Sequence, residues 1–297
     1  MPPATDRTGP APARASALVL AAVLSLSGIA GLTGCSASPS PSALPANAAG
    51  ALPGAAGATT SGAPGVTATA KVRNPSNGRL EAVVPDVGRT VLLIGDSQSE
   101  PADGWPRLGL AAAGYNVYFC GRGGTGFVAA NGSTGNYIDA LLRGDWQLPS
   151  GTPALIVVEG GGNDAASGAA NARIAENAER LIAELQGRYP GTRVAMIGTL
   201  ARGKDDGGGR RSEVDALLGS VAAAHGLPFV SVGDWLTRYG LAKDLADSVH
   251  MNSDGRRALG SLLERRLREL GLDRKTTPAP DQAPLAAVPL TGSPLQD

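Results

Sequence analysis

The sequence predicts an α/β fold: a three-layer α/β/α sandwich around a five-stranded parallel sheet, of the flavodoxin-like kind. Three observations favour it, namely short apolar runs, amphipathic helical patterns between them, and polar or glycine-rich motifs directly after the runs. Right-handed crossovers between successive parallel strands place helices on both faces of the sheet. Functional side chains are then expected at the carboxyl ends of the strands.

Five apolar runs are expected to form the strands, in the order 90–94, 116–120, 154–159, 193–199 and 228–232. Three segments have apolar residues at the i, i+3, i+4, i+7 spacing of a helix with one buried face, and they are 174–185, 214–221 and 259–270. Helices of this kind, placed between the strands, supply the outer layers of the sandwich.

The ends of the chain differ in composition from this pattern. Residues 36–70 are almost wholly Ala, Gly, Pro, Ser and Thr, so they have too few large apolar side chains to offset the entropy lost on ordering. Residues 275–297 contain five prolines and lack helical periodicity. We therefore expect four parts, which are a signal over 1–34, a tether and lead-in over 35–87, one folded domain over 88–272, and a disordered Pro-rich tail over 273–297.

The first 34 residues resemble an export signal. Arg7 and Arg14 precede a mostly apolar run over 15–32, which serines and a glycine interrupt. The run ends in Leu-Thr-Gly-Cys, which resembles the lipobox of bacterial lipoproteins. That resemblance implies cleavage before Cys35, lipidation of Cys35 and attachment to the outer face of the cytoplasmic membrane. An ordinary cleaved signal peptide, giving a secreted protein, and an uncleaved anchor are the alternatives.

Charge and residue counts exclude several classes of partner. The chain has 26 basic and 26 acidic residues, so a nucleic-acid partner has no electrostatic support. With two cysteines and two histidines in the sequence, neither a disulfide scaffold nor a Cys/His metal site is expected. The chemistry must come from other groups, and we predict no cofactor and no metal.

Each of the first three strand runs leads into residues suited to acyl transfer. Ser97 follows the first run, where a serine serves either as a nucleophile or, by residue preference alone, more often as a helix N-cap. The glycine-rich segment 121–126 follows the second run and Asn163 follows the third, and backbone N–H groups with an Asn amide suit an oxyanion hole. Downstream, Asp247 precedes His250 by three residues, which lets the carboxylate orient the imidazole.

These four motifs resemble, in order, the four blocks of the SGNH hydrolase superfamily, also called GDSL hydrolases. The resemblance implies Ser97 as the nucleophile, Asp247 and His250 as the rest of a catalytic triad, and an oxyanion hole formed by Gly123, Asn163 and the Ser97 amide. It further implies a carboxylic ester hydrolase that forms an acyl-enzyme. The expected substrate is a small-molecule or polymer-linked acyl ester, and export would bring envelope lipids and acylated cell-wall glycans within reach.

Two residues depart from the family pattern, because Gln98 stands where the family usually has Leu and Gly121 where it usually has Asn. Segment 121–126 also spells G-x-G-x-x-G, but a dinucleotide site requires a helix to begin there, and Asn131-Gly132 and Gly135-Asn136 interrupt the chain within ten residues. A non-catalytic envelope-binding module on the same fold is the alternative function. His225 is expected to end a helix and Cys120 to be a buried residue, with a reactive thiol as its alternative.

Overall fold

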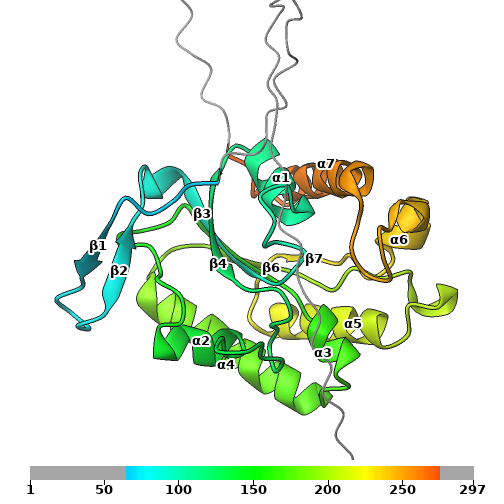
Figure 1. Cartoon of the computed structure of the whole chain (residues 1–297), viewed down its shortest axis with the longest axis horizontal. Helices are drawn as coiled ribbons and strands as arrows, with labels where there is room; N and C mark the ends of the chain where they lie inside the picture. Colours follow the sequence, from blue (N-terminus) through cyan, green and yellow to red (C-terminus); the bar gives the residue numbers. More distant parts are fainter. Residues whose placement is uncertain (1–64, 275–297) are drawn as a thin grey trace, which may run out of the picture. The chain divides into compact units, whose positions relative to one another are not determined.

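A five-stranded parallel sheet organises residues 65–274, the part of the chain that this computed structural model describes (Figure 1). Its spatial order is β4-β3-β5-β6-β7, the flavodoxin-like order. The strands are β3 (Thr90–Gly95), β4 (Asn116–Gly121), β5 (Leu155–Glu159), β6 (Val194–Ile197) and β7 (Phe229–Val230), and all four pairings are parallel. The predicted fold class is confirmed, and each strand begins and ends inside its predicted run or one residue beyond it.

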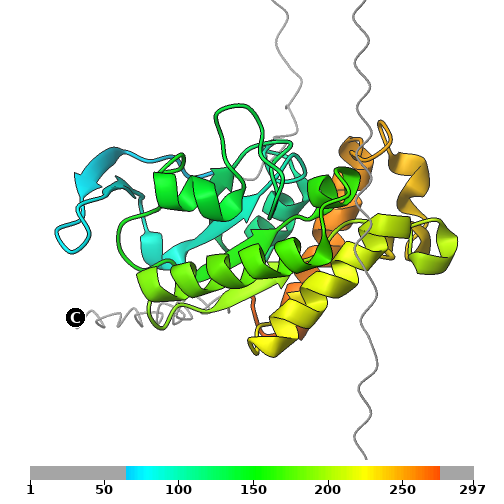
Figure 2. The same ribbon diagram turned by 90° about the horizontal axis from the view of Figure 1, so that it is seen from below.

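Helices cover both faces of this sheet (Figures 1 and 2). On one face lie α2 (Tyr137–Arg143), α4 (Asn171–Arg188) and α5 (Gly209–Ala224), and on the other lie α1 (Trp105–Ala112) and α7 (Ser253–Glu269). The shorter elements are α3 (Gly162–Ala166), α6 (Trp235–Arg238) and the 3-10 turns η1 (Val87–Arg89), η2 (Lys204–Asp206) and η3 (Leu241–Asp244).

The alternation of side chains along β3 explains the two layers. Leu92 and Ile94 are buried with the side chains of α2, α4 and α5, whereas Val91 and Leu93 are buried with those of α1 and α7. Successive residues of a strand point to opposite faces, so a continuous apolar run buries both. Each such buried side chain contributes about 1.5 to 3 kcal/mol. The apolar run that forms β3 thus packs against both helical layers.

Two glycines let α1 and α7 approach closely. A Cβ on Gly109 would lie 2.7 Å from Cβ of Leu263, and a Cβ on Gly260 would lie 2.8 Å from Cβ of Leu108. Real Cβ atoms do not come so close, so larger residues would push the helices apart. This packing fixes the start of α7, directly after the segment that carries His250.

The segment expected as a lead-in contains a hairpin, β1 (Ala70–Arg73) paired antiparallel with β2 (Leu80–Val83). Most of its side chains are exposed, so the hairpin has no buried apolar face that would have predicted it from the sequence. Within residues 65–274 no helix is both long and apolar enough to cross a bilayer. The predicted signal, Cys35, most of the tether and nearly all of the tail lie outside the described residues.

Candidate active site

Ser97 lies in a tight turn at the carboxyl end of β3. The Asp96 carbonyl accepts the N–H of Ser99 at 3.0 Å and of Glu100 at 2.9 Å, and the Asp96 carboxylate accepts the N–H of Gln98 at 2.9 Å. No helix begins at Ser97, since the N-cap of the next helix, α1, is Gly104. The N-cap interpretation of this serine is therefore wrong, and the hydroxyl is free for chemistry.

His250 and Asp247 reach Ser97 from the other end of the sequence. His250 Nε2 lies 2.8 Å from Ser97 Oγ, and His250 Nδ1 lies 2.8 Å from Asp247 Oδ2. The other oxygen, Asp247 Oδ1, accepts the N–H groups of Val249 and His250, each at 2.7 Å. These backbone N–H groups, that of His250 first, and then the imidazole hold the pKa of Asp247 well below its usual range. The aspartate thus stays ionised and fixes the ring.

The start of α7 supports this arrangement. Asn252 is its N-cap, and Asn252 Oδ1 accepts the N–H of Gly255 at 2.9 Å. The cap defines where the chain leaves the loop that carries the imidazole.

Two of the proposed oxyanion groups, Gly123 and Asn163, lie near Ser97, but their donors already have partners. Gly123 is adjacent to Ser97, because a Cβ on Gly123 would lie 3.3 Å from Ser97 Cβ. Its N–H donates to Glu100 Oε2 at 2.9 Å. Asn163 Nδ2 donates to Asp96 Oδ2 at 3.1 Å and to the Thr125 carbonyl at 2.9 Å. To bind there, the carbonyl oxygen of an ester would have to displace the Glu100 carboxylate from the Gly123 N–H. It would also have to accept one of the hydrogen bonds that the Asn163 amide now donates to Asp96 and Thr125.

Asn163 lies in a helix that the sequence did not reveal. The short helix α3 begins at Gly162, one residue before it, and its N-cap Gly161 has a φ of 98°. The periodicity that begins near residue 174 belongs to the next helix, α4. A five-residue helix with a glycine at its start is too short to show helical periodicity in the sequence.

Asp164, next to Asn163, holds the glycine-rich loop in place. Its carboxylate accepts three consecutive backbone N–H groups, those of Phe127 at 2.8 Å, Val128 at 2.7 Å and Ala129 at 2.8 Å. Asp164 is fully buried. One carboxylate therefore ties the loop bearing Gly123 to the helix bearing Asn163, a role that sequence reasoning missed.

Two further acids lie beneath the nucleophile turn. Burial raises the pKa of Asp96 to about 6. Burial, and then the charge of Asp96, raise the pKa of Glu159 well above its usual range, while Ser99 Oγ donates to Glu159 Oε2 at 2.7 Å. Arg211 lies close enough to favour the charged form of both acids. These groups form a buried polar network directly under Ser97.

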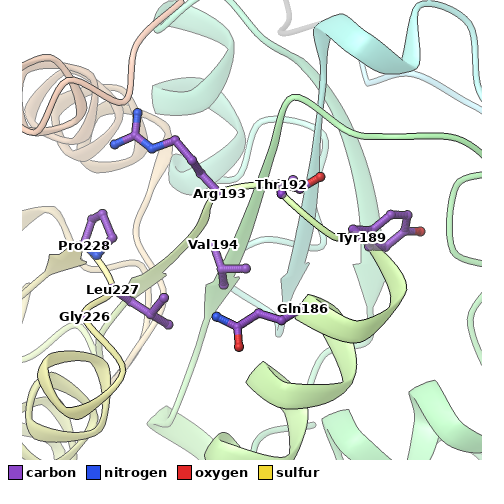
Figure 3. A pocket seen from close by; sticks show the side chains of 9 residues that line it. Gln186, Tyr189, Thr192, Arg193, Val194, Gly226, Leu227 and Pro228 are labelled. Carbon is purple, nitrogen blue, oxygen red and sulfur yellow. The ribbon is translucent and has the colours of Figure 1, made fainter.

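The cavity at Ser97 is small. It has a volume of about 50 Å³, and Ser97, Asn163, Arg211 and His250 are among its lining residues. A larger hollow of about 520 Å³ lies at the opposite end of the sheet, where β6 and β7 begin (Figure 3). Figure 3 shows Arg193, Val194 and Leu227 along it, and none of the proposed catalytic residues lines it. The larger of these two cavities is therefore not the one that Ser97 and His250 line.

Other residues singled out in the sequence are placed elsewhere. His225 is the C-cap of α5, at the end of the sheet where β7 begins, away from Ser97. Cys120 is buried, and burial raises the pKa of its thiol to about 12, which opposes a reactive role. The glycine-rich loop does not open into a helix, because α2 begins only at Tyr137. Among residues 65–274, no His, Cys, Asp and Glu side chains group as a metal site.

Comparisons with known proteins place this geometry in context. Residues 87–258 match the family described as GDSL-like Lipase/Acylhydrolase. No curated protein matches the chain. Similar solved structures include the lipase/acylhydrolase from Enterococcus faecalis, at 22% identity, 61% of this chain, 96% of that chain and a TM-score of 0.47. A member of the lipolytic protein G-D-S-L family from Veillonella parvula is 20% identical, with 61% of this chain and 97% of that chain covered and a TM-score of 0.46. A carbohydrate esterase family 2 enzyme from Corynascus thermopiles is 15% identical, with 66% of this chain and 70% of that chain covered and a TM-score of 0.47.

Proposed function

Because the chain belongs to the GDSL-like lipase/acylhydrolase family and is a carboxylic ester hydrolase, we propose that it works as a serine esterase through Ser97, His250 and Asp247. The observation that carries this proposal is the continuous set of contacts from Ser97 Oγ to His250 Nε2 and from His250 Nδ1 to Asp247 Oδ2, each 2.8 Å long. Nucleophile and base within hydrogen-bond reach, with a third group orienting the base, form a serine triad.

In the proposed reaction, His250 Nε2 takes the proton of Ser97 as Oγ attacks the ester carbonyl carbon. The bond to the alcohol then breaks, and His250 returns the proton to the departing alcohol oxygen. Water releases the acyl group from Ser97 by the same roles in reverse. Negative charge on the carbonyl oxygen would be stabilised by the N–H groups of Ser97 and Gly123 and by the Asn163 amide.

We propose a substrate with a short acyl group, such as acetyl. The cavity of about 50 Å³ beside Ser97 leaves little room for a long chain, and the Arg211 side chain contributes to its polar lining. The alcohol part would be an envelope lipid or a cell-wall glycan if the protein is exported. A series of activated esters of increasing acyl length tests this, and a preference for long chains would contradict it.

We also propose that the protein is exported and anchored through a lipid on Cys35. The support is the sequence alone, since the Leu-Thr-Gly-Cys motif ends an apolar run preceded by arginines. Each buried CH₂ of a lipid anchor contributes about 0.8 kcal/mol, so Cys35→Ala should release the protein from membranes and abolish the mass increase due to lipid. Unchanged membrane attachment and unchanged mass in Cys35→Ala would contradict the lipoprotein proposal.

Ser97→Ala tests the proposed function. The variant should fold with an unchanged Tm, lose fluorophosphonate labelling, and lose about 10⁴-fold or more in kcat, because no other group attacks the carbonyl. A non-catalytic envelope-binding module predicts instead that the wild-type protein is neither labelled nor active. Turnover that is unchanged in Ser97→Ala would exclude Ser97 as the nucleophile.

A further inference from the structure

Gln98, the residue directly after the nucleophile, has a hydrogen-bond partner at each end of its side chain. Its Nε2 donates to the main-chain carbonyl of Val249 at 2.9 Å, and its Oε1 accepts from Trp105 Nε1 at 3.1 Å. Gln98 is 8% exposed, and Trp105 is fully buried in the core beneath α1. Gln98 therefore connects the buried core to the segment that carries His250.

That segment, residues 245–250, has few other anchors on the nucleophile side. The side chains of Asp247 and His250 are 54% and 36% exposed. The hydrogen bonds from the Val249 and His250 N–H groups to Asp247, and from the Ala246 N–H to the His250 carbonyl, stay within the segment. Among the described residues, the Gln98–Val249 hydrogen bond joins this segment to the nucleophile turn, alongside the contact between His250 and Ser97 itself.

The bond acts on the peptide unit next to the base. The carbonyl of Val249 and the N–H of His250 belong to one planar peptide group. Gln98 holds its oxygen from the nucleophile turn, and Asp247 Oδ1 holds its N–H at 2.7 Å. The bond from Gln98 therefore ties this peptide group, from which the His250 side chain starts, to the turn that carries Ser97, while the bond to Asp247 orients it within its own segment.

Stability accounts for the acceptor end of this amide, because the fully buried Trp105 N–H needs a hydrogen-bond partner. It does not account for the donor end in the same way, because Val249 is only partly buried. We propose that Gln98 is a positioning residue, which holds the Val249–His250 peptide so that Nε2 stays within reach of Ser97 Oγ. This inference rests on the proposed serine esterase mechanism, in which a small misplacement of the base lowers the rate strongly.

Gln98→Met is the central test, because methionine has a similar length and no hydrogen bond to offer. We expect kcat to fall about tenfold, with KM for a short activated ester changed less than about twofold and the fluorophosphonate labelling rate falling in parallel with kcat. Gln98→Glu keeps an acceptor for Trp105 but lacks the donor for Val249, so it should reproduce the loss. Trp105→Phe keeps the hydrogen bond between Gln98 and Val249, so its kcat should fall less than that of the two Gln98 variants.

Tm measurements on each variant separate folding from positioning. The proposal is overturned if Gln98→Met has the kcat and labelling rate of the wild type, or if it raises KM and leaves kcat unchanged. If Gln98→Met does not fold, the same measurements on Gln98→Glu decide. Ser97→Ala, measured in parallel, keeps the two proposals apart. If Ser97→Ala keeps its activity, the serine mechanism fails; if it is inactive while both Gln98 variants match the wild type, only the positioning role fails.

Discussion

The nucleophile side and the base side of this active site are held in different ways. Ser97 follows a fully buried strand and lies over a buried network of Asp96 and Glu159, and its oxyanion loop is tied down by the buried Asp164. Asp247 and His250 instead lie on a largely exposed segment, which is held by its own hydrogen bonds, by the cap of the following helix and by the Gln98–Val249 hydrogen bond. The difference indicates that changes on the buried side should affect stability and activity together, and changes on the exposed side mainly activity.

The largest effect is expected on the exposed side. His250→Ala should remove nearly all kcat, by about 10³-fold or more, and leave Tm within a few degrees, because the side chain is 36% exposed. His225→Ala is the matched control, since it changes the only other histidine and lies at the far end of α5. Initial rates on one activated ester check this. An inactive His225 variant beside an active His250 variant would overturn the assignment of the base.

The next effect is expected on the buried side. Asp164→Ala leaves the N–H groups of Phe127, Val128 and Ala129 without their acceptor, which should lower the free energy of unfolding by about 2 to 3 kcal/mol. The labelling rate should fall as well, because the loop with Gly123 loosens. Asp205→Asn, an exposed aspartate, is the control in denaturant unfolding. If Asp164→Ala keeps wild-type stability, the contrast between the two sides does not hold.

The smallest effect is expected for an exposed residue on the nucleophile side. Glu100 is exposed, and its carboxylate occupies the Gly123 N–H that the ester oxygen should use. Glu100→Ala should therefore raise kcat/KM two- to fivefold and tighten binding of a boronic acid that mimics the tetrahedral intermediate, since a charge-assisted hydrogen bond no longer competes. Asp103→Asn, nearby in sequence and paired with Arg256, is the control. Weaker boronate binding in Glu100→Ala would instead give Glu100 a supporting role.

Features with a local sequence pattern could be predicted, and features without one could not. The five strands were predicted because apolar runs are local signals, and the short motifs that contain Ser97, Asp247 and His250 were recognised for the same reason. The catalytic roles of these three residues stay predictions. The hairpin over 70–83 and the helix α3 were not predicted, since one is exposed and the other too short for periodicity.

Long-range partners left no local signal either. Gln98 stood out as a departure from the family, but Val249, which it contacts, is 151 residues away. Glu100 and Asp164 act on backbone N–H groups 23 and 35 to 37 residues away, and a backbone group has no residue type to recognise. Contacts of this kind emerge only when the chain is folded.

The buried pair of Asp96 and Glu159 has a consequence for the acidity in which the domain is most stable. The pKa of Asp96 rises from 3.8 to about 6 in the folded protein, and that of Glu159 also rises. An acid that binds its proton more tightly when folded stabilises the fold fully below its unfolded pKa, and this contribution is lost as the pH rises through the folded value. In mildly acidic surroundings the folded domain therefore holds a proton on Asp96, beneath the proposed nucleophile. Its free energy of unfolding should decrease when the pH rises to neutral and Asp96 loses that proton.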